Sequence, residues 1–284
     1  IIFALKWLNA VPLMKDYCVQ VERISFYHPI KPVNWVKCFC KRWVTVMPMG
    51  WNRDDSVIKL TQDDVRLVML AAQGLLASTQ KKAAKEDLVP LIQKMGYLQI
   101  DTIQAVRRSQ YLVLWSRLGA FEPAWLDDIY KAGALFEYYA HALCYLPIDD
   151  YPIYRGLMLH DDGTGNHWKG WGDQHPEIIE RVRAIVEKTG SISSAFFDSP
   201  TVSTGWGDVK QEKMALNRMF AIGDLMVSHR EKFRRYFDLR EKILPDWRDE
   251  DALESNAARK ALLLKAVRAL GVAREDWGPP YFHM

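Results

Sequence analysis

The sequence predicts a mostly α-helical fold of the α+β class, built from tandem helix-turn-helix units with small β-hairpins. Three observations predict it. Apolar residues recur at helical spacing through much of residues 60–270. Glycines such as Gly96 and Gly223 follow directly where several of these periods stop. The stretches 134–147 and 225–239 change to patterns typical of paired strands.

Composition limits the classes of protein that the chain can belong to. Its 284 residues suffice for two domains, and a hydrophobic content of 49% supports a sizeable core. No apolar run reaches the roughly 18 residues of a membrane span, and residues 1–14 lack the pattern of a signal peptide. The net charge of +3 alone says little about partners. The cysteines lack zinc-site spacing, which favours free thiols in a reducing compartment and neither a metal nor a cofactor: Cys18, Cys38, Cys40 and Cys144.

The chain divides into four expected regions. Residues 1–57 show no sustained period and are expected to be a poorly ordered extension. Residues 58–173 form a first unit and residues 174–249 a second, while residues 250–284 begin a third unit that the chain cuts short.

In the first unit, Thr61 is expected to cap a helix because Asp63 and Asp64 follow it in the first turn. The expected order is helix 63–77, helix 85–95, an extended segment 97–103, helices 109–118 and 123–132, a strand pair in 134–147, helix 149–159 and a loop over 160–173.

The second unit is expected to run from an amphipathic helix to a hairpin. The expected order is helix 174–189, a short helix 193–198, a loop with Gly205 and Gly207, helix 211–222, and strands 225–227 and 233–239, with helix 250–270 after the unit. Helix, helix and then hairpin is the order of a winged helix, a variant of the helix-turn-helix.

Gln99 and Asp101 are the candidate catalytic pair. An extended segment points alternate side chains to opposite faces, so the two would lie side by side, about 7 Å apart at the backbone. A carboxylate can accept a proton from an attacking water, or stabilise positive charge that develops on a sugar. A neighbouring amide can hold that water because it both donates and accepts. By spacing alone, such a pair more often belongs to the solvated face of a strand.

Basic and aromatic residues are the candidate DNA contacts. The window 230–242 is rich in lysine and arginine and could neutralise phosphates on a wing, or be an ordinary solvated hairpin. Tyr138 and Tyr139 could stack on a base or pack in the core, and His141 could equally be a packed, hydrogen-bonded residue. The residues assigned to DNA are Arg107, Arg108, Tyr138, Tyr139, His141, Lys210, Lys213, Arg230, Lys232, Arg234 and Arg235.

Four motifs in order carry a family resemblance: Leu70-Ala71-Ala72-Gln73-Gly74-Leu75, Leu98-Gln99-Ile100-Asp101-Thr102-Ile103, Tyr111-Leu112-Val113-Leu114-Trp115-Ser116-Arg117-Leu118-Gly119 and Glu137-Tyr138-Tyr139-Ala140-His141. Over residues 60–277 the chain resembles the YcaQ/AlkZ-like winged-helix DNA glycosylases, which unhook interstrand crosslinks and excise alkylated bases. The family signature, Gln-apolar-Gln or Gln-apolar-Asp, matches Gln99-Ile100-Asp101.

The resemblance implies a monofunctional, cofactor-free enzyme. Water would displace an N7-alkylated purine from double-stranded DNA and leave an abasic site. It also implies a monomer without a membrane anchor, associated with the nucleoid in the bacterial cytoplasm.

The chain departs from the family pattern in two ways. Relatives commonly carry a carboxylate after the histidine that matches His141, where this chain has Ala142. The family also has a third winged helix and a C-terminal β-barrel, which the chain is expected to lack. Two alternatives therefore stay open: a non-enzymatic winged-helix DNA-binding protein, and an inactive, truncated glycosylase.

Overall fold

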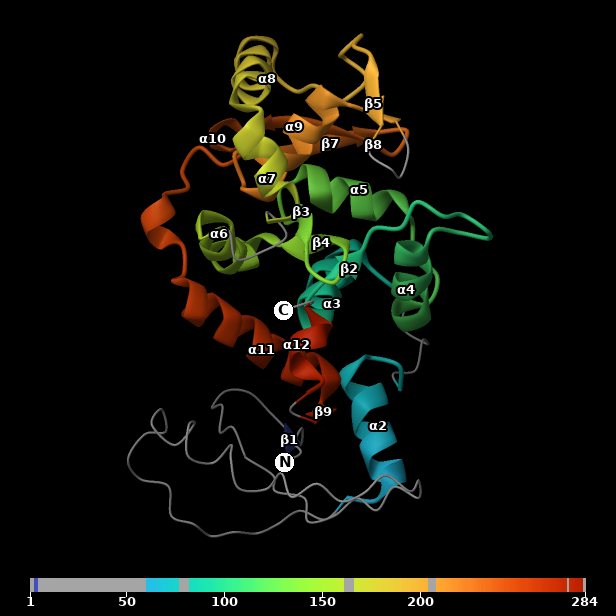
Figure 1. Ribbon diagram of the computed structural model, residues 1–284. Helices are drawn as coiled ribbons and strands as arrows, with labels where there is room; N and C mark the ends of the chain where they lie inside the picture. Colours follow the sequence, from blue (N-terminus) through green and yellow to red (C-terminus); the bar gives the residue numbers. More distant parts are fainter. Residues whose placement is uncertain are drawn as a thin grey trace.

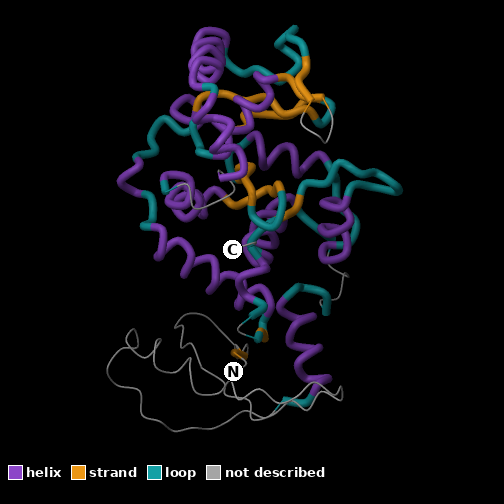
Figure 2. Tube along the Cα trace, in the orientation of Figure 1, coloured by secondary structure: helices purple, strands orange, loops and turns teal. Residues whose placement is uncertain are grey.

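The computed structural model describes residues 3–4, 60–76, 82–160, 166–203, 208–274 and 276–282. Apart from residues 3–4, the expected N-terminal extension 1–57 lies outside the described residues. The described chain is elongated and has three tiers, with the second winged helix at the top of the view and α2 at the bottom (Figure 1). Helices predominate and the sheets are small and antiparallel (Figure 2), which confirms the predicted fold class.

The first winged-helix unit fills the middle tier. Its elements are η2 (Lys85–Asp87), α3 (Leu88–Met95), β2 (Leu98–Gln99), α4 (Ser109–Leu118), α5 (Ala124–Lys131), β3 (Leu135–Tyr139) and β4 (Leu143–Pro147). Strand β4 lies between β2 and β3 in a three-stranded antiparallel sheet. Each helix and the strand pair stand where the sequence predicts them. Gly96 ends α3 with a φ of +87°, a conformation that favours glycine.

The core of this unit follows from the spacing of its apolar residues. Leu88, Ile92 and Met95 recur at intervals of four and three and are buried on one face of α3. They pack with Leu114 of α4 and Leu126 of α5 in one cluster that also contains residues of the sheet. Burial of each such side chain contributes about 1.5–3 kcal/mol, so this helical face holds the sheet and helices together.

The second winged-helix unit forms the top tier (Figure 1). Its elements are α8 (Pro176–Thr189), β5 (Thr201–Ser203), β6 (Asp208–Lys210), α9 (Gln211–Ala221), β7 (Leu225–Glu231) and β8 (Arg234–Leu239), followed by α10 (Arg240–Ile243). Ile192 forms a β-bridge to Phe237 of β8, so the order Ile192, β8, β7 repeats the sheet order of the first unit. Lys232 and Phe233 form the hairpin turn with φ of +47° and +71°, as a turn with two left-handed residues requires.

Two predictions about secondary structure are wrong. The short helix expected over 193–198 is absent, because Ile192 exchanges both backbone hydrogen bonds with Phe237 and the chain continues as a turn. The loop expected over 160–173 contains α7 (Asn166–Gln174). A Cβ at Gly172 would lie 3.0 Å from Cγ of Arg218, so close packing on α9 holds this glycine in a helix against its low propensity.

The bottom tier joins the two ends of the described chain. Helix α11 packs against α6 and against α2, which carries the predicted Thr61 cap. The side-chain amide of Gln73 donates to the Ala269 backbone carbonyl at 2.5 Å, and the Gln73 backbone carbonyl accepts from Nε of Arg117. The elements of this tier are β1 (Phe3–Ala4), α2 (Gln62–Ala72), α11 (Ser255–Leu270), β9 (Val272–Ala273) and α12 (Gly278–Tyr281). In the chain, η3 (Ile148–Asp150) and α6 (Tyr151–Leu159) connect the first unit to the second, and η4 (Asp249–Asp251) precedes α11.

A second hydrophobic cluster joins the two winged-helix units. It contains Phe136 and Tyr138 of β3, Tyr154 of α6, Phe220 of α9 and Phe237 of β8. Several of these rings meet edge to face, the arrangement that aromatic pairs favour. The sheet of the first unit is therefore fixed against the second unit. In the described part of the chain, no helix is both long and apolar enough to span a bilayer.

Candidate functional site

Gln99 and Asp101 lie at the open edge of the first sheet. Strand β2 pairs with β4 on one side only. Leu98 and Ile100 are buried, whereas Gln99 is exposed and Asp101 is half-exposed. The alternation predicted from the sequence is therefore present, and it leaves an amide and a carboxylate on the accessible side of the strand.

Two hydrogen bonds fix Asp101 where the strand ends. Its backbone N–H donates to Oε1 of Gln110 at 3.1 Å, and Gln110 is buried in the first turn of α4. Its Oδ1 accepts from the Ile103 N–H at 2.9 Å, which turns the chain away from the sheet. The backbone of Asp101 is thus held by α4, and its carboxylate by its own loop. The sequence offers one signal for Gln110, a polar residue four positions before the buried Leu114 on the same helical face.

His141 lies beside this edge. The Ile100 N–H donates to the Leu143 carbonyl at 2.8 Å, which extends the pairing beyond Gln99 and brings Asp101 next to the turn between β3 and β4. His141 is exposed in that turn, and its ring lies parallel to Tyr97 with centroids 6.5 Å apart. The edge therefore combines an amide, a carboxylate and an imidazole.

Residues 92–282 match the family model described as DNA glycosylase AlkZ-like. The chain belongs to the AlkZ-like DNA glycosylase family. The matched residues include β2, α4, the β3–β4 and β7–β8 hairpins and α11. The fold is also similar to that of the Streptomyces sahachiroi DNA glycosylase AlkZ, with a TM-score of 0.52 and 15% sequence identity over 80% of this chain. The chain spans 65% of the length of that protein.

The tyrosines assigned to DNA in this AlkZ-like chain face inward. Tyr138 is buried, its hydroxyl donates to the Ala221 carbonyl at 2.5 Å, and its ring packs on Tyr154 and Phe220. Tyr139 is half-buried, and its ring lies 5.4 Å from that of Phe220. The structure thus corrects the assignment of Tyr138, which joins the two units and cannot stack on a base.

The Arg230 side chain is largely buried and is bonded to groups inside the protein. Its Nε and Nη2 atoms each donate at 2.6 Å to one carboxylate oxygen of Glu137, whose side chain has no exposed area. Its Nη1 donates to the Phe233 carbonyl. Such a two-pronged pair fixes geometry as well as charge. The sequence-based assignment of Arg230 to phosphate binding is therefore wrong, because the wing packs on β3.

Arg235 and Lys210 also support the second unit. Arg235 donates to Oδ1 of Asn217 at 3.0 Å, and its guanidinium lies 4.9 Å from the centre of the Phe237 ring. Lys210 donates to the Phe197 carbonyl. These contacts lie within the second unit and stabilise it, and the sequence alone gives no sign of them.

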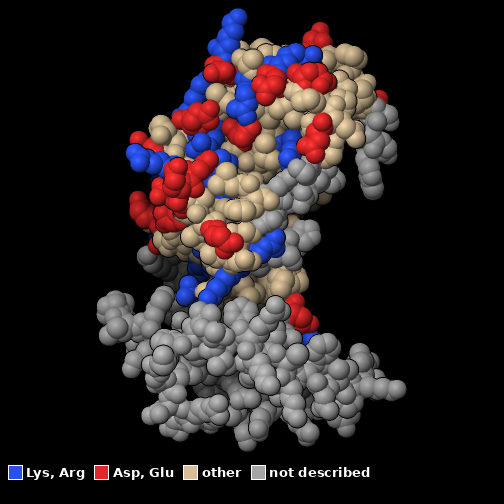
Figure 3. Space-filling view, turned by 60° about the vertical axis from the view of Figure 1, so that its left-hand side comes forward, with Lys and Arg blue, Asp and Glu red and all other residues tan. Residues whose placement is uncertain are grey.

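Arg108 connects the loop after Asp101 to the wing. Its guanidinium lies 4.0 Å from the centre of the Phe233 ring, and that of Arg230 lies 4.6 Å from the same ring. Arg107, Lys213, Lys232 and Arg234 remain exposed. On the face shown in Figure 3, basic and acidic side chains are interspersed over the described surface. This face is therefore not a single basic patch.

Within the described ranges, no group of three or more His, Cys, Asp or Glu side chains is arranged to hold a metal ion. Cys144 is buried as a free thiol, and burial raises its pKa to about 11. The chemistry that the open edge can supply is that of Gln99, Asp101 and His141.

Proposed function

We propose that the chain is a monofunctional DNA glycosylase that hydrolyses the N-glycosidic bond of N7-alkylated purines, including purines in interstrand crosslinks. One observation carries the proposal. Along an accessible sheet edge, Gln99 and Asp101 alternate with buried apolar residues, so that both lie on the accessible side. Both lie inside the residues that match the AlkZ-like family. The reaction needs a carboxylate and a group that holds water, and this edge offers both.

In the proposed reaction, the bond between C1′ of the sugar and N9 of the base breaks, and its electron pair goes to the base. Alkylation at N7 has already made the base cationic, so it leaves as a neutral purine without a strong general acid. Asp101 stabilises the positive charge that develops on the sugar. Gln99 holds the water that bonds to C1′, and the proton of that water passes to the Asp101 carboxylate or to solvent. The product is an abasic site.

Exposed basic residues on both units are proposed to hold the duplex. Arg107 follows the catalytic edge in sequence, and Lys232 and Arg234 lie on the wing. Their contacts would be to phosphates, which position a duplex without reading its sequence. We propose that the chain acts as a monomer on DNA in the bacterial cytoplasm and needs no cofactor.

The test is single-turnover release of N7-methylguanine from alkylated duplex DNA. We expect Asp101→Asn and Gln99→Ala each to lower the rate, with a loss of about 10²–10⁴-fold for a group that handles the proton. Asp127→Asn, which removes an exposed carboxylate on α5, is the matched control and should react like the parent. The same variants are then tested on a crosslinked duplex.

Duplex affinity and circular dichroism are measured on each variant to separate binding and folding from chemistry. A folded parent that binds duplex DNA but releases no base would refute the enzyme and favour a DNA-binding protein without catalytic activity. Equal rates for Asp101→Asn and the parent would remove the carboxylate from the mechanism.

A further inference from the structure

The segment after Asp101 exposes an unusual amount of apolar surface. Ile103 is 72% exposed and Val106 is 82% exposed, both in the loop before α4. Trp115 is 59% exposed on α4 itself. Exposed apolar groups gathered in one region mark a binding surface more often than a chance arrangement.

All charged side chains of the same segment are positive. Residues 102–121 contain Arg107, Arg108 and Arg117 and no aspartate or glutamate. Of the three, Arg107 is the exposed one, because Arg108 lies over the Phe233 ring and Arg117 donates to Gln73. An apolar surface with an exposed cation suits a partner with flat rings and negative charge. Nucleic acid has both properties, because its bases have π-faces and its backbone carries phosphates.

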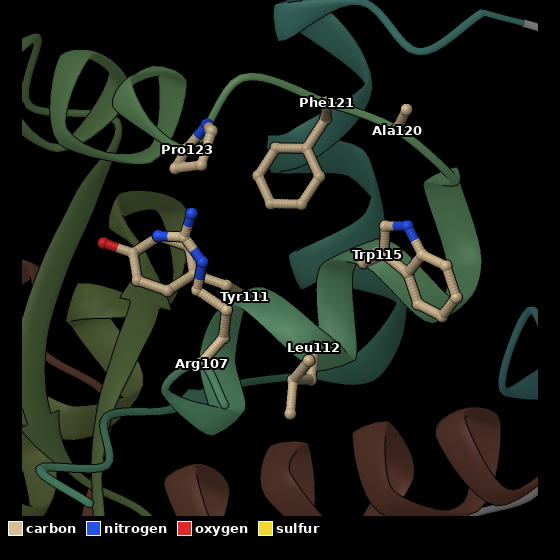
Figure 4. Close-up of a pocket in the computed structure, with 7 residues that line it drawn as sticks. All are labelled: Arg107, Tyr111, Leu112, Trp115, Ala120, Phe121 and Pro123. Carbon is tan, nitrogen blue, oxygen red and sulfur yellow. The ribbon is translucent and has the colours of Figure 1, made fainter. Parts of the chain in front are cut away.

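A pocket of about 410 Å³ lies within this surface. Figure 4 shows that Tyr111, Leu112 and Trp115 project from α4, while Phe121 and Pro123 come from the segment that follows the helix. Aromatic rings thus stand on both sides of the opening. The full lining is Arg107, Tyr111, Leu112, Trp115, Ala120, Phe121 and Pro123. Its volume falls within the range of sites for small ring compounds, about 300–1,000 Å³.

The pocket is built on the helix that holds the catalytic edge. Gln110, which accepts the Asp101 N–H, directly precedes Tyr111 in α4. Arg107 lies between Asp101 and Tyr111 in the sequence and lines the pocket, where its guanidinium can reach a phosphate or stack on a base. The pocket and the edge that bears Asp101 therefore share the first turn of α4 and the loop before it.

We propose that this pocket binds an unpaired nucleobase of the DNA strand at or next to the lesion. The proposal rests on the proposed function, because it assumes that the catalytic edge faces DNA. Tyr111, Trp115 and Phe121 stack on the base, and Arg107 contacts the adjoining phosphate. The site is sequence-tolerant because every base presents a π-face.

The proposal is tested by binding alone, on undamaged DNA, so that its outcome does not depend on base release. The probes are a fluorescein-labelled single-stranded oligonucleotide, and a duplex that contains one unpaired 2-aminopurine. We expect Trp115→Ala to weaken binding of the single strand by about 5–150-fold, the range that stacking on one base gives. Binding of a fully paired duplex should change far less.

Trp277→Ala is the matched control, because Trp277 is also an exposed tryptophan but lies in the C-terminal segment. It should bind as the parent does, and Trp115→Phe should retain most of the affinity because a ring remains. The parent should quench the 2-aminopurine, and Trp115→Ala should restore its fluorescence. Circular dichroism confirms that each variant is folded.

Three outcomes would overturn the proposal. One is equal single-strand affinity for Trp115→Ala and the parent, with unchanged quenching. Another is an equal loss on paired and unpaired DNA, which would make the surface a general duplex contact. The third is a parent that binds no nucleic acid through this surface, as expected if the pocket serves a protein partner. None of these results decides whether Asp101 cleaves the glycosidic bond.

Discussion

The two winged-helix units share one order of elements but differ at the strand edge. In the first unit, the edge strand exposes Gln99 and leaves Asp101 accessible. In the second, the position equivalent to Gln99 is Ser193, which is 4% exposed. It follows Ile192, which is bonded to Phe237 through both backbone groups as Leu98 is paired with Tyr145. Ser191, which precedes Ile192, is held by Ser228 and Asp238. The same topology thus presents chemistry in one copy and closes the edge in the other, so the site rather than the fold decides function.

The β3–β4 and β7–β8 hairpins also differ, in how much of each is buried. Residues 135–138 of β3 are all buried, because α5 covers one face and the second unit covers the other. The β7–β8 hairpin instead ends in exposed Lys232 and Arg234. The β3–β4 hairpin is therefore a structural joint, whereas the β7–β8 hairpin packs on it at the base and is a surface only at its tip. The predictions below test this division, beginning with the largest expected effect.

Glu137→Gln should destabilise the protein most. It leaves Arg230 buried without its counter-charge, and loss of one partner of a buried pair costs about 3–5 kcal/mol. Urea denaturation measures the free energy of unfolding. Glu231→Gln, an exposed carboxylate on the same hairpin, should change it by less than about 0.5 kcal/mol. Similar losses for both would mean that the joint does not depend on this ion pair.

Tyr138→Phe and Tyr130→Phe should each cost about 0.5–1.5 kcal/mol, the net value of one hydrogen bond. Their hydroxyls donate to Ala221 and Val227 in the second unit. Both variants should lower the midpoint of a single calorimetric transition. Separate transitions for the two units, with only one shifted, would show that the units unfold independently.

Lys232→Ala and Arg234→Ala should leave stability within about 0.5 kcal/mol of the parent but weaken duplex binding. Each lost phosphate contact should reduce the slope of log affinity against log salt by about 0.9. Arg235→Ala should instead lower stability, since Arg235 bonds to Asn217 and lies over Phe237. An unchanged salt slope for both exposed variants would remove the hairpin tip from the DNA contacts.

The smallest expected effect concerns the chemical reactivity of the Cys144 thiol. Because burial raises its pKa to about 11, the folded protein holds the thiol protonated. The contribution of this thiol to the free energy of unfolding is fully present below the pKa of the unfolded thiol, about 8.5, and is lost as pH rises from there toward 11. At pH 8, iodoacetamide should leave Cys144 unmodified in native protein and modify it in urea, as peptide mass spectrometry can show. Rapid native labelling would contradict its burial.

Most of the fold could be predicted because it follows from local patterns. Helical periods and terminal glycines located α3, α4, α5 and α9, and strand alternation placed Gln99 and Asp101 on one face. What failed depends on distant partners. Glu137 and Arg230 are 93 residues apart in sequence, and nothing local distinguishes Arg230 from the exposed Arg234. The turn at 193–198 likewise follows from the pairing of Ile192 with Phe237.

Phe233 lies between the guanidinium groups of Arg108 and Arg230 at the tip of the hairpin. Its backbone has a φ of +71°, a strained conformation for an aromatic residue that this type of hairpin turn requires. Arg108 belongs to the segment that leaves Asp101, and Arg230 is locked to the central sheet. The tip of the hairpin is therefore joined to the segment that leaves Asp101 through the Phe233 ring, and to the sheet that contains β2 through the Arg230–Glu137 pair.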